Sequence, residues 1–594
     1  DARAILLTGT ENAFTAGGDL WVMDTVLREP RLVCGETRSH ETEVVFGPNN
    51  NEIWFLRDFG DRTEIWKAVR KNKDAFWFEN DKFTLSVEQK KSLAFIRSVG
   101  NNYNVTVVEG VTGSGKTLVY FERIKDILDK GFQSLIMLPE IALTNQFSRR
   151  FKEFFGSEPA IWHSSMSKKN KSIIWKGISE GEIKIVIGAR SSLFLPFKNL
   201  GLIIVDEEHD VSYKQDEGVS YNARDMAITR ASLENIPINL ITSIPSIETY
   251  NNIINKKYHV TNLKKRYKEV PLPKIEIINL KNEDLSKESW IAKKTINEAN
   301  KYLNKGEQVL FFLNRRGYAP FVICKDCGYK FQCPNCSVNL NYHKKINKLL
   351  CHYCGHKSNL SRVCRNNKKC NFIFCGPGIE RVFEELKKIY PDKNIEIFSS
   401  DTLKKKKYTQ NLLQQVENKK IDILVGTQLL SKGFHFPKLN CIVVVDSDFS
   451  SHGYDLRSAE KNIQLYHQLS GRAGRFSSES LIVYQTLNPH NETLNELIKN
   501  KSEELLENEL VLRKKNKLPP FKRLIAIIIS SKDQSLSLQG AREIKVKLNQ
   551  INDLEVLGPV DSPLLKIKKN FRSRLLVKFD NQIFMQKKIT KVLN

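Results

Sequence analysis

The chain has 594 residues, of which 41% are hydrophobic and 27% are charged, a composition typical of a soluble protein with several domains. Its 93 Lys and Arg against 67 Asp and Glu give a formal net charge of +26, which favours a polyanionic partner, nucleic acid before a membrane surface. The alternative is a lysine-rich bias that only keeps the surface soluble. No apolar run reaches the roughly 18 residues that a membrane span needs, so we expect no membrane-spanning segment.

The N-terminal residues 1–40 differ in character from the rest of the chain. The run Ala4–Leu20 resembles a short stretch of the crotonase family, in which the turn Ala-Gly-Gly-Asp-Leu supplies an oxyanion-hole amide. That resemblance covers residues 1–25, and no other crotonase element is found after it. We interpret it as a fusion, a gene-boundary artefact or a coincidence; a crotonase-like enzyme is a distant alternative, which a failure to bind acyl-CoA would exclude. Residues 41–82 are polar with scattered aromatics and predict a linker or a small folded piece.

From about residue 83, short apolar runs alternate with helical stretches, the pattern of a parallel α/β sheet. The first set of predicted strands comprises Thr106–Glu109, Ser134–Leu138, Lys184–Ile187 and Leu202–Val205. The second set comprises Gln308–Leu313, Ile421–Val425 and Cys441–Val445, and a cysteine-rich block interrupts it. We therefore expect two α/β units, the second carrying a metal module as an insertion, and then an α+β region from about residue 491.

A glycine-rich turn comes directly after the first predicted strand. Gly110-Val-Thr-Gly113-Ser114-Gly115-Lys116-Thr117 matches GxxxxGK[ST] between a strand and a helix. Glycines let backbone N–H groups close around phosphate oxygens at a helix N-terminus. Lys116 is expected to reach the β- and γ-phosphates and Thr117 to ligate Mg²⁺, so the motif predicts ATP binding.

An acidic pair ends the predicted strand Leu202–Val205. Asp206 and Glu207 come directly after this strand and precede Glu208 and His209. In this position one carboxylate lies near Mg²⁺ and the next can polarise the attacking water. An acidic strand cap is the alternative, but it does not explain the pairing with the upstream glycine-rich turn. The two motifs together predict a P-loop ATPase with Lys116, Asp206 and Glu207 as catalytic residues.

The segment Asp206–Arg224 (DEEHDVSYKQDEGVSYNAR) resembles the primosomal protein N′ (PriA) family of replication-restart DNA helicases, in superfamily 2. Further matches occur in the family's order: Leu85–Gln89, Pro139–Thr144, Gly188–Ser191, Phe312–Gly317, Gly426–Gly433 and Gln468–Arg475. The resemblance covers roughly residues 83–594. It implies two RecA-like helicase lobes, ATP and Mg²⁺ as cofactors, and stepping along one DNA strand as the lobes close.

The resemblance also implies roles for residues outside the two ATPase motifs. Gln89 would read the adenine edge, Gln468 belongs to the nucleotide motif of the second lobe, and Arg472 and Arg475 would reach across the cleft to the γ-phosphate. Such arginines stabilise the charge that develops in the transition state. The candidate DNA contacts are Arg190, Tyr213, Lys214, Tyr221, Arg224, Lys432, Lys568 and Arg572.

Aromatic and cationic residues alternate directly after the acidic pair, in the segment Tyr213–Arg224. Base stacking on aromatic side chains is worth roughly 1–3 kcal/mol per base and tolerates any sequence, which suits a translocase. In the family this loop couples DNA contact to ATP hydrolysis. For each tyrosine the alternative is packing inside the loop. The basic stretch Lys566–Arg574 resembles the family's C-terminal DNA-binding domain, and its alternative is a solvated basic strand.

Eight cysteines fall in pairs whose spacing predicts structural zinc. They are Cys324, Cys327, Cys333, Cys336, Cys351, Cys354, Cys364 and Cys370. Four pairs imply two Zn²⁺ ions. The resemblance implies nested pairing, in which the four middle cysteines share one ion and the outer pairs share the other.

Two positions depart from the family pattern. The family's last cysteine would fall on Asn367, so we expect Cys370 to complete the outer zinc site, with Cys375 or a weaker site as alternatives. Ile244 stands where the family motif has threonine, and an isoleucine cannot replace that hydroxyl in coupling hydrolysis to unwinding.

These observations divide the chain into five predicted parts: an atypical segment at 1–40, a linker or winged-helix remnant at 41–82, helicase lobe 1 at 83–262, lobe 2 at 263–490 with a zinc insertion at 321–375, and a C-terminal DNA-binding domain at 491–594. The chain begins with Asp1 and shows no signal peptide, and its clustered cysteines favour a reducing compartment, so we expect a cytoplasmic protein.

We expect an ATP-dependent 3′→5′ DNA helicase of the replication-restart primosome that recognises and unwinds branched forks. The resemblance implies single-stranded and forked DNA, single-stranded-DNA-binding protein and helicase loaders as partners, no membrane, and a monomer. Two alternatives remain. One is an ATP-switched, zinc-containing DNA-binding scaffold with little or no unwinding, and the other is a repair or RNA helicase of the same superfamily.

Overall fold

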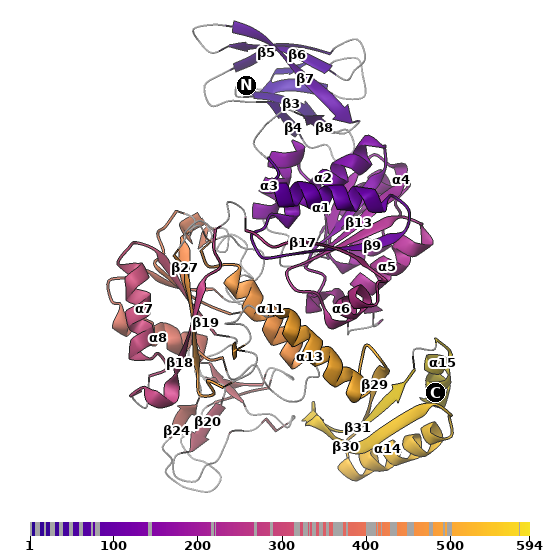
Figure 1. Ribbon diagram of the computed structural model, residues 1–594, viewed down its shortest axis with the longest axis vertical. Helices are drawn as coiled ribbons and strands as arrows, with labels where there is room; N and C mark the ends of the chain where they lie inside the picture. The colour runs from indigo at the N-terminus through magenta and orange to yellow at the C-terminus, as the bar shows by residue number, and fades with distance from the viewer. Residues whose placement is uncertain are drawn as a thin grey trace. The chain divides into compact units, whose positions relative to one another are not determined.

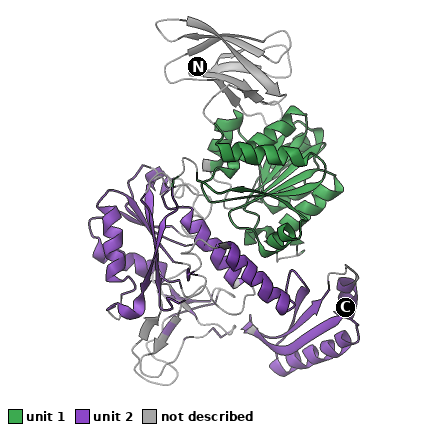
Figure 2. Ribbon diagram, viewed as in Figure 1, with its two compact units in different colours: residues 1–270, 432–435 green, residues 271–431, 436–594 purple. Residues whose placement is uncertain are grey.

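A computed structural model describes most of the chain from residue 84 onward and, before it, only the backbone of strands β1–β8. Beyond residue 83 the undescribed residues are 140–144, 165, 216–218, 220, 267–269, 286–288, 314–320, 325–330, 332, 335–339, 344–347, 352–355, 360–371, 376–377, 399–410, 413, 417, 428–435, 437, 448–456, 475–478, 491–493, 496–501, 581–582 and 594. The chain divides into two compact units, residues 1–270 with 432–435 and the remainder, which Figure 2 colours separately.

The backbone described before residue 84 consists of strands in two antiparallel sheets. One holds β1 (Arg3–Ile5), β2 (Asn12–Ala16), β3 (Asp19–Met23) and β4 (Pro30–Cys34), and the other β5 (His40–Phe46), β6 (Glu52–Asp58), β7 (Thr63–Asn72) and β8 (Ala75–Trp77).

Lobe 1, residues 84–266 of the first unit, is built on a seven-stranded sheet in the order β11-β12-β10-β13-β16-β9-β17. Every ladder in it is parallel. Its elements are α1 (Val87–Val99), β9 (Asn104–Gly110), α2 (Lys116–Asp129), β10 (Gln133–Met137), α3 (Asn145–Phe155), β11 (Ala160–Trp162), α4 (Lys168–Glu180), β12 (Ile185–Gly188), η2 (Arg190–Phe194), β13 (Leu200–Asp206), η3 (Val211–Tyr213), β14 (Lys214–Gln215), β15 (Tyr221–Asn222), α5 (Ala223–Leu233), β16 (Pro237–Thr242), α6 (Ile247–Ile254) and β17 (His259–Leu263).

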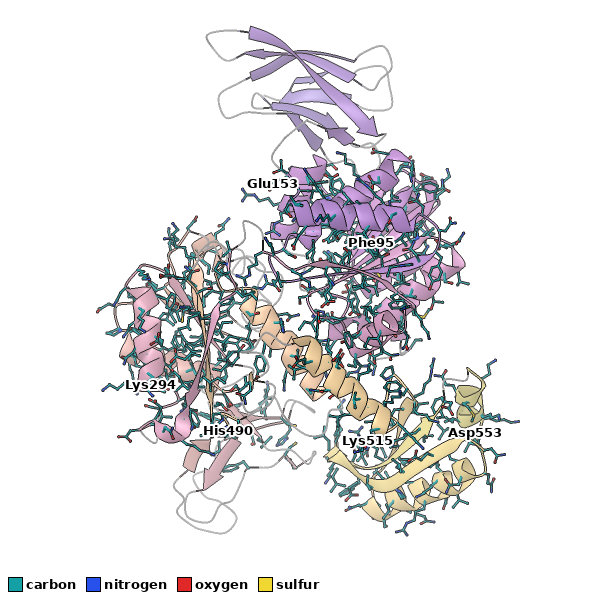
Figure 3. The ribbon with its side chains drawn as sticks, viewed as in Figure 1. Phe95, Glu153, Lys294, His490, Lys515 and Asp553 are labelled. Atoms are coloured by element: carbon teal, nitrogen blue, oxygen red, sulfur yellow. The ribbon has the colours of Figure 1, made fainter. Side chains whose placement is uncertain are left out.

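The sheet of lobe 1 is buried on both faces, as its continuous apolar strands predict. Helices α1, α2 and α3 pack on one face, where Phe121 contacts a group of aromatic rings that includes Phe151 and Phe155. Helices α4 and α5 cover the other face through Ile178 and Ala227. Figure 1 shows these two helical layers around the sheet, and Figure 3 adds the side chains, among them Phe95 of α1 and Glu153 of α3. The carboxyl ends of the strands therefore share one edge, where the predicted motifs lie.

Lobe 2, in the second unit, repeats this plan on a six-stranded sheet in the order β18-β28-β27-β19-β26-β25, again parallel in every ladder. Its sheet strands and helices are β18 (Lys274–Asn279), η5 (Leu280–Asn282), α7 (Lys293–Leu303), β19 (Gln308–Phe312), α8 (Ile379–Ile389), β25 (Ile395–Phe398), β26 (Ile423–Gly426), β27 (Leu439–Val444), α11 (Ser458–Ser470) and β28 (Leu481–Thr486). Between β19 and α8 lie the short antiparallel strands β20 (Phe321–Cys324), β21 (Asn341–His343), β22 (Lys348–Leu350), β23 (Lys357–Asn359) and β24 (Phe372–Cys375).

The C-terminal region is α+β. It consists of α13 (Ser502–Lys515), β29 (Arg523–Ser531), α14 (Gln534–Asn549), β30 (Leu554–Ile567), β31 (Asn570–Phe579) and α15 (Ile583–Leu593). Its antiparallel sheet has the order β29-β31-β30. A buried ion pair joins α13 to lobe 2, because Arg513 Nη2 lies 3.3 Å from Glu460 Oε2 on α11.

The predicted fold class of two parallel α/β lobes with a C-terminal α+β region is confirmed. In the part of the chain that the structure describes, no helix has both the length and the apolar character needed to cross a membrane.

Candidate active site

The glycine-rich turn between β9 and α2 adopts a conformation that only glycines can hold. Gly113 and Gly115 have φ values of 90° and 80°, in the left-handed region. A Cβ atom added to Gly115 would clash with the side-chain nitrogen of Gln89, so another residue here would displace the Gln89 amide as well as strain the backbone. The turn is therefore shaped by close approach of α1 on one side and opens onto the N-terminus of α2.

Polar groups that suit a phosphate chain line this turn. Lys116 Nζ lies across it and donates to the carbonyls of Gly110, at 2.6 Å, and Val111, at 3.4 Å. The Ser114 hydroxyl is buried and makes no hydrogen bond within the described part of the chain. Thr117 is the second residue of α2. A phosphate can bind at this helix N-terminus and meet both the Lys116 ammonium and the Ser114 hydroxyl.

Gln89, predicted to read adenine, is tied to the glycine-rich turn. Its side chain is 1% exposed, and Nε2 donates to the Ser114 carbonyl at 2.8 Å. Its Oε1 accepts the backbone N–H of Ser86, completing a capping box at the start of α1. In the structure both polar atoms of this amide thus support the turn and the helix.

Asp206, the last residue of β13, lies beside the helix that the turn begins. Its Oδ2 accepts the hydroxyl of Tyr120, a residue of α2, at 3.1 Å. Burial, with the Glu207 charge as a second cause, raises the pKa of Asp206 to about 7, while Lys116 opposes the rise. Without a further cation, Asp206 is therefore partly protonated near neutral pH. Mg²⁺ is the cation that would hold it ionised.

Glu207 stands in a strained backbone position at the edge of the site. Its φ is 49°, unusual for a residue other than glycine. Its Oε2 is buried and accepts no hydrogen bond in the described residues, although His209 Nε2 lies 3.6 Å away. A buried carboxylate oxygen of this kind can accept a proton from a water molecule.

His209 connects the acidic motif to the segment after β16. Its Nδ1 lies 2.8 Å from the Thr242 hydroxyl, and that hydroxyl donates to the Ile244 carbonyl at 2.6 Å. Because a hydroxyl has one hydrogen to donate, His209 Nδ1 must carry the hydrogen of this contact. Ile244 is buried and has no hydroxyl. The hydroxyl that links the two segments therefore belongs to Thr242.

Tyr213, a predicted DNA contact, is a buried anchor in this structure. Its side chain is 1% exposed, and its hydroxyl lies within hydrogen-bond distance of the backbone carbonyls of Asp206, at 2.6 Å, and Met137, at 3.0 Å, which share its one hydrogen. Burial raises the pKa of the Tyr213 hydroxyl well above its ordinary value, so the group keeps its hydrogen. The alternative stated for the tyrosines, packing inside the loop, describes this residue.

Arg224, at the other end of the loop, is buried as well. Its Nη1 donates to Glu208 Oε2 at 2.9 Å, and the same carboxylate accepts the Ser246 backbone N–H at 2.7 Å and the Thr249 hydroxyl at 3.0 Å. Burial lowers the pKa of Arg224, but the charges of Glu208 and Asp225 outweigh it and raise the pKa. The loop from residue 213 to 224 is therefore fixed at both ends to the segment 206–208.

The remaining predicted contacts of lobe 1 lie together on the exposed side of the loop. Arg190 Nη1 donates to the Lys214 carbonyl at 3.0 Å, and Lys214 is exposed. The ring of Tyr221 meets Phe194 edge to face, with 5.5 Å between ring centroids. Phe194 is 55% exposed and was missed by sequence reasoning. Its only signal is an aromatic residue four positions after the arginine of a DNA motif.

In the second unit, Gln468 and Arg472 are buried at the end of α11, where the Arg472 N–H donates to the Leu469 carbonyl at 2.9 Å. Arg475 and Lys432 lie outside the described residues. In the C-terminal sheet, Lys568 occupies the turn between β30 and β31 with a φ of 48°, and Arg572 pairs with Ser530 on β29.

Two predicted zinc ligands are described with their side chains. Cys333 and Cys351 are buried in one cluster with Val322, Leu340, Tyr342 and Leu349. Cys324 is described only as backbone of β20, and Cys327, Cys336, Cys354, Cys364 and Cys370 lie outside the described residues. Among the residues that the structure describes, three or more metal-ligating side chains do not gather at any point. Cys333 and Cys351 thus belong to the same buried cluster, and the zinc ligand set stays a prediction.

Three protein-family descriptions match the chain: a DEAD/DEAH box helicase over residues 88–242, a helicase conserved C-terminal domain over 345–477, and a primosomal protein N C-terminal domain over 514–593. The replication restart protein PriA of Rickettsia conorii is 44% identical over 504 residues, covering 85% of this chain and 77% of that protein.

A second relative and a solved structure are less similar to this chain. PriA of Bacillus subtilis is 34% identical over 526 residues, 88% of this chain and 65% of that protein. A structure of RecG bound to a three-way DNA junction is 18% identical, covers 72% of this chain and 46% of that one, and has a TM-score of 0.43, which is too low to carry an inference.

The pKa of Asp206 gives a testable dependence of stability on pH. Because this carboxyl holds its proton more tightly in the folded state, its contribution to stability is lost as pH rises through about 7. Asp206→Asn, which stays neutral, is expected to melt at a higher temperature than the parent chain at pH 8 in EDTA, and the difference should shrink at pH 5. Asp129→Asn, at the exposed end of α2, is the control. A difference independent of pH would contradict the assignment.

Proposed function

This chain belongs to the PriA family of replication restart proteins, and we propose that it unwinds branched DNA at stalled forks by moving 3′→5′ along one strand. It is an ATP-hydrolysing DNA helicase of replication restart. The proposal depends on one observation, which is that the two ATPase motifs are in contact. Tyr120, from the helix after the phosphate turn, donates to Asp206, the residue that ends the acidic strand. The polarity and the preference for forks rest on the family resemblance.

The residues of lobe 1 account for the chemistry of hydrolysis. Mg²⁺ would bind Asp206 and Thr117 and neutralise charge on the phosphates. Lys116 would hold the β- and γ-phosphates, and Glu207 would take a proton from the attacking water. Arg472 and Arg475, from lobe 2, are proposed to stabilise the charge that develops on the γ-phosphate.

Single-stranded DNA is proposed to contact the exposed side of the loop. Arg190 and Lys214 supply positive charge, and Phe194 with Tyr221 supplies aromatic surface. The buried ends of the same loop support its role in coupling. Tyr213 contacts the backbone carbonyl of Asp206 and Arg224 the carboxylate of Glu208, so a displacement of the loop would act on the segment 206–208 that carries the catalytic carboxylates. The Thr242 hydroxyl contacts His209 and the Ile244 carbonyl. This link supports the proposal that ATP hydrolysis stays coupled to unwinding although Ile244 has no hydroxyl.

We also propose two structural Zn²⁺ ions, which hold the cysteine-rich insertion together. For the outer site, the backbone favours Cys370 over Cys375. In the antiparallel ladder of β20 and β24, Cys324 pairs with Phe372, and Cys375 pairs with Phe321 at the opposite end, about 10 Å along the strand. Cys370 lies two residues before the position opposite Cys324.

The remaining parts of the proposal rest on the resemblance. The partners are single-stranded-DNA-binding protein and helicase-loading proteins of the primosome, the chain acts as a monomer in the cytoplasm, and residues 491–594 contribute DNA contacts through Lys568, Arg572 and the basic turn. Lys566 lies over the Phe571 ring at 4.9 Å from its centroid, an arrangement that leaves a cation and an aromatic ring together at this turn.

The first test is strand displacement on forked DNA with a nascent leading strand. The parent chain is expected to displace strands with ATP and to require a 3′ single-stranded tail on partial duplexes. Lys116→Ala should lower ATP hydrolysis roughly a hundredfold or more and abolish displacement, because it removes the phosphate cation. Lys91→Ala, exposed on α1, is the matched control. DNA-stimulated hydrolysis without displacement would instead identify an ATP-switched scaffold, and faster unwinding of RNA forks an RNA helicase.

The DNA-contacting side of the loop is tested at Phe194. Phe194→Ala is expected to raise the DNA concentration that half-saturates ATP hydrolysis by roughly fivefold or more, because a stacked base contributes about 1–3 kcal/mol. Trp175→Ala removes an aromatic ring of similar exposure, 47%, from α4 and should leave this concentration unchanged. Equal effects of both substitutions would argue against a specific contact at Phe194.

The zinc proposal predicts a difference between two cysteine substitutions. The parent chain and Cys375→Ser are expected to contain two zinc ions per chain, whereas Cys370→Ser should lose one of them on dialysis. Metal content is measured by elemental analysis of the purified protein, with thermal unfolding as an independent check of folding. Loss of zinc from Cys375→Ser and its retention in Cys370→Ser would assign the outer site to Cys375.

A further inference from the structure

The segment directly after β17 is held tightly against the phosphate turn. β17 runs parallel to β9, with Leu263 opposite Gly110, and the Leu263 carbonyl accepts the Val111 N–H at 3.1 Å. Two residues later, the Lys265 N–H donates to Glu88 Oε2 on α1 at 3.0 Å. The segment is therefore fixed on one side to the turn and on the other to the first helix of lobe 1.

This attachment brings Arg266 to the turn. Arg266 is 5% exposed, and its Cγ lies 3.9 Å from the position that a Cβ on Gly113 would occupy. Burial lowers the pKa of Arg266 to about 10, so the guanidinium remains charged at neutral pH. A guanidinium is costly to desolvate, and a charged side chain whose stem lies beside the phosphate turn suits an anion bound there.

We propose that Arg266 contacts the phosphate chain of the bound nucleoside triphosphate, as a second cation of lobe 1 beside Lys116. The inference rests on the proposed function, because it assumes that the turn binds a nucleotide. The guanidinium offers a planar set of donors that match phosphate oxygens in pairs, whereas the Lys116 ammonium acts as a point charge. Lys116 follows the turn directly in the sequence, whereas Arg266 comes from the C-terminal end of lobe 1.

The phosphate chain is the part of the nucleotide that the placement of Arg266 favours. Gly113 lies inside the turn, where backbone N–H groups face phosphate oxygens, and Arg266 is the side chain closest to the missing Cβ of that glycine. Gln89, by contrast, approaches Gly115 at the start of α2. Arg266 and Gln89 thus flank different parts of the turn, and the stem of the Arg266 side chain is on the side of Gly113.

The test compares nucleotide and phosphate binding in the full chain. Dissociation constants for Mg-ATP and for inorganic tripolyphosphate are measured by competition against a fluorescent ADP analogue. Arg266→Gln is expected to weaken both roughly tenfold or more, the effect of losing a charged hydrogen bond. Arg266→Lys, which keeps the charge but not the paired donors, should weaken both by less. Lys264→Gln removes an exposed charge from the same segment and should change neither.

The outcomes separate this inference from the function on which it rests. Weaker ATP binding with unchanged tripolyphosphate binding would place Arg266 at the base or the ribose and overturn the inference. Unchanged binding of both in Arg266→Gln would also overturn it. If Arg266→Gln fails to fold, as judged by thermal unfolding, the decision passes to Arg266→Lys, for which unchanged binding of both probes is again the contrary result. Failure of the parent chain to bind ATP would refute the proposed function itself.

Discussion

The catalytic edge of lobe 1 is organised around Asp206, a carboxylate at the end of a parallel strand that is only partly ionised near neutral pH. Asp206 ends β13, accepts the Tyr120 hydroxyl and has its pKa raised to about 7 by burial and by Glu207. A group in this balance responds strongly to a nearby cation. Binding of Mg²⁺ with a nucleotide would therefore ionise Asp206 as well as fill the site. The change in charge would be greatest at the elements that contact Asp206.

The loop from residue 213 to 224 is attached at both ends to the segment 206–208, because Tyr213 contacts the Asp206 backbone carbonyl and Arg224 the Glu208 carboxylate. Tyr213 and Arg224 are buried against residues 206–208, whereas Phe194 and Tyr221 present aromatic surface to solvent. A strand that contacts Lys214 or Tyr221 would therefore act close in sequence to Tyr213 and Arg224, which hold the segment 206–208 in place.

Motifs that are continuous in sequence could be predicted, because their chemistry depends on neighbours a few residues away. The phosphate turn and the acidic pair are of this kind, and so is the fold class. Tyr213 and Arg224 could not be placed correctly from residue type, since their burial depends on partners such as Met137 and Ser246. Arg266 belongs to no motif and reaches the turn only through the pairing of β17 with β9. Arg475 and Lys432 lie outside the described residues, so the roles predicted for them stay predictions.

The hydrogen bond between Lys265 and Glu88 joins residues 177 positions apart and closes lobe 1 around the phosphate turn. During synthesis the chain emerges from its N-terminus, so the turn itself leaves the ribosome long before the strand that supports it. A nucleotide can find a complete pocket only after β17 has been made and paired with β9. Nucleotide binding that depends on the contacts of β17 with the phosphate turn would therefore follow the pairing of β17 with β9.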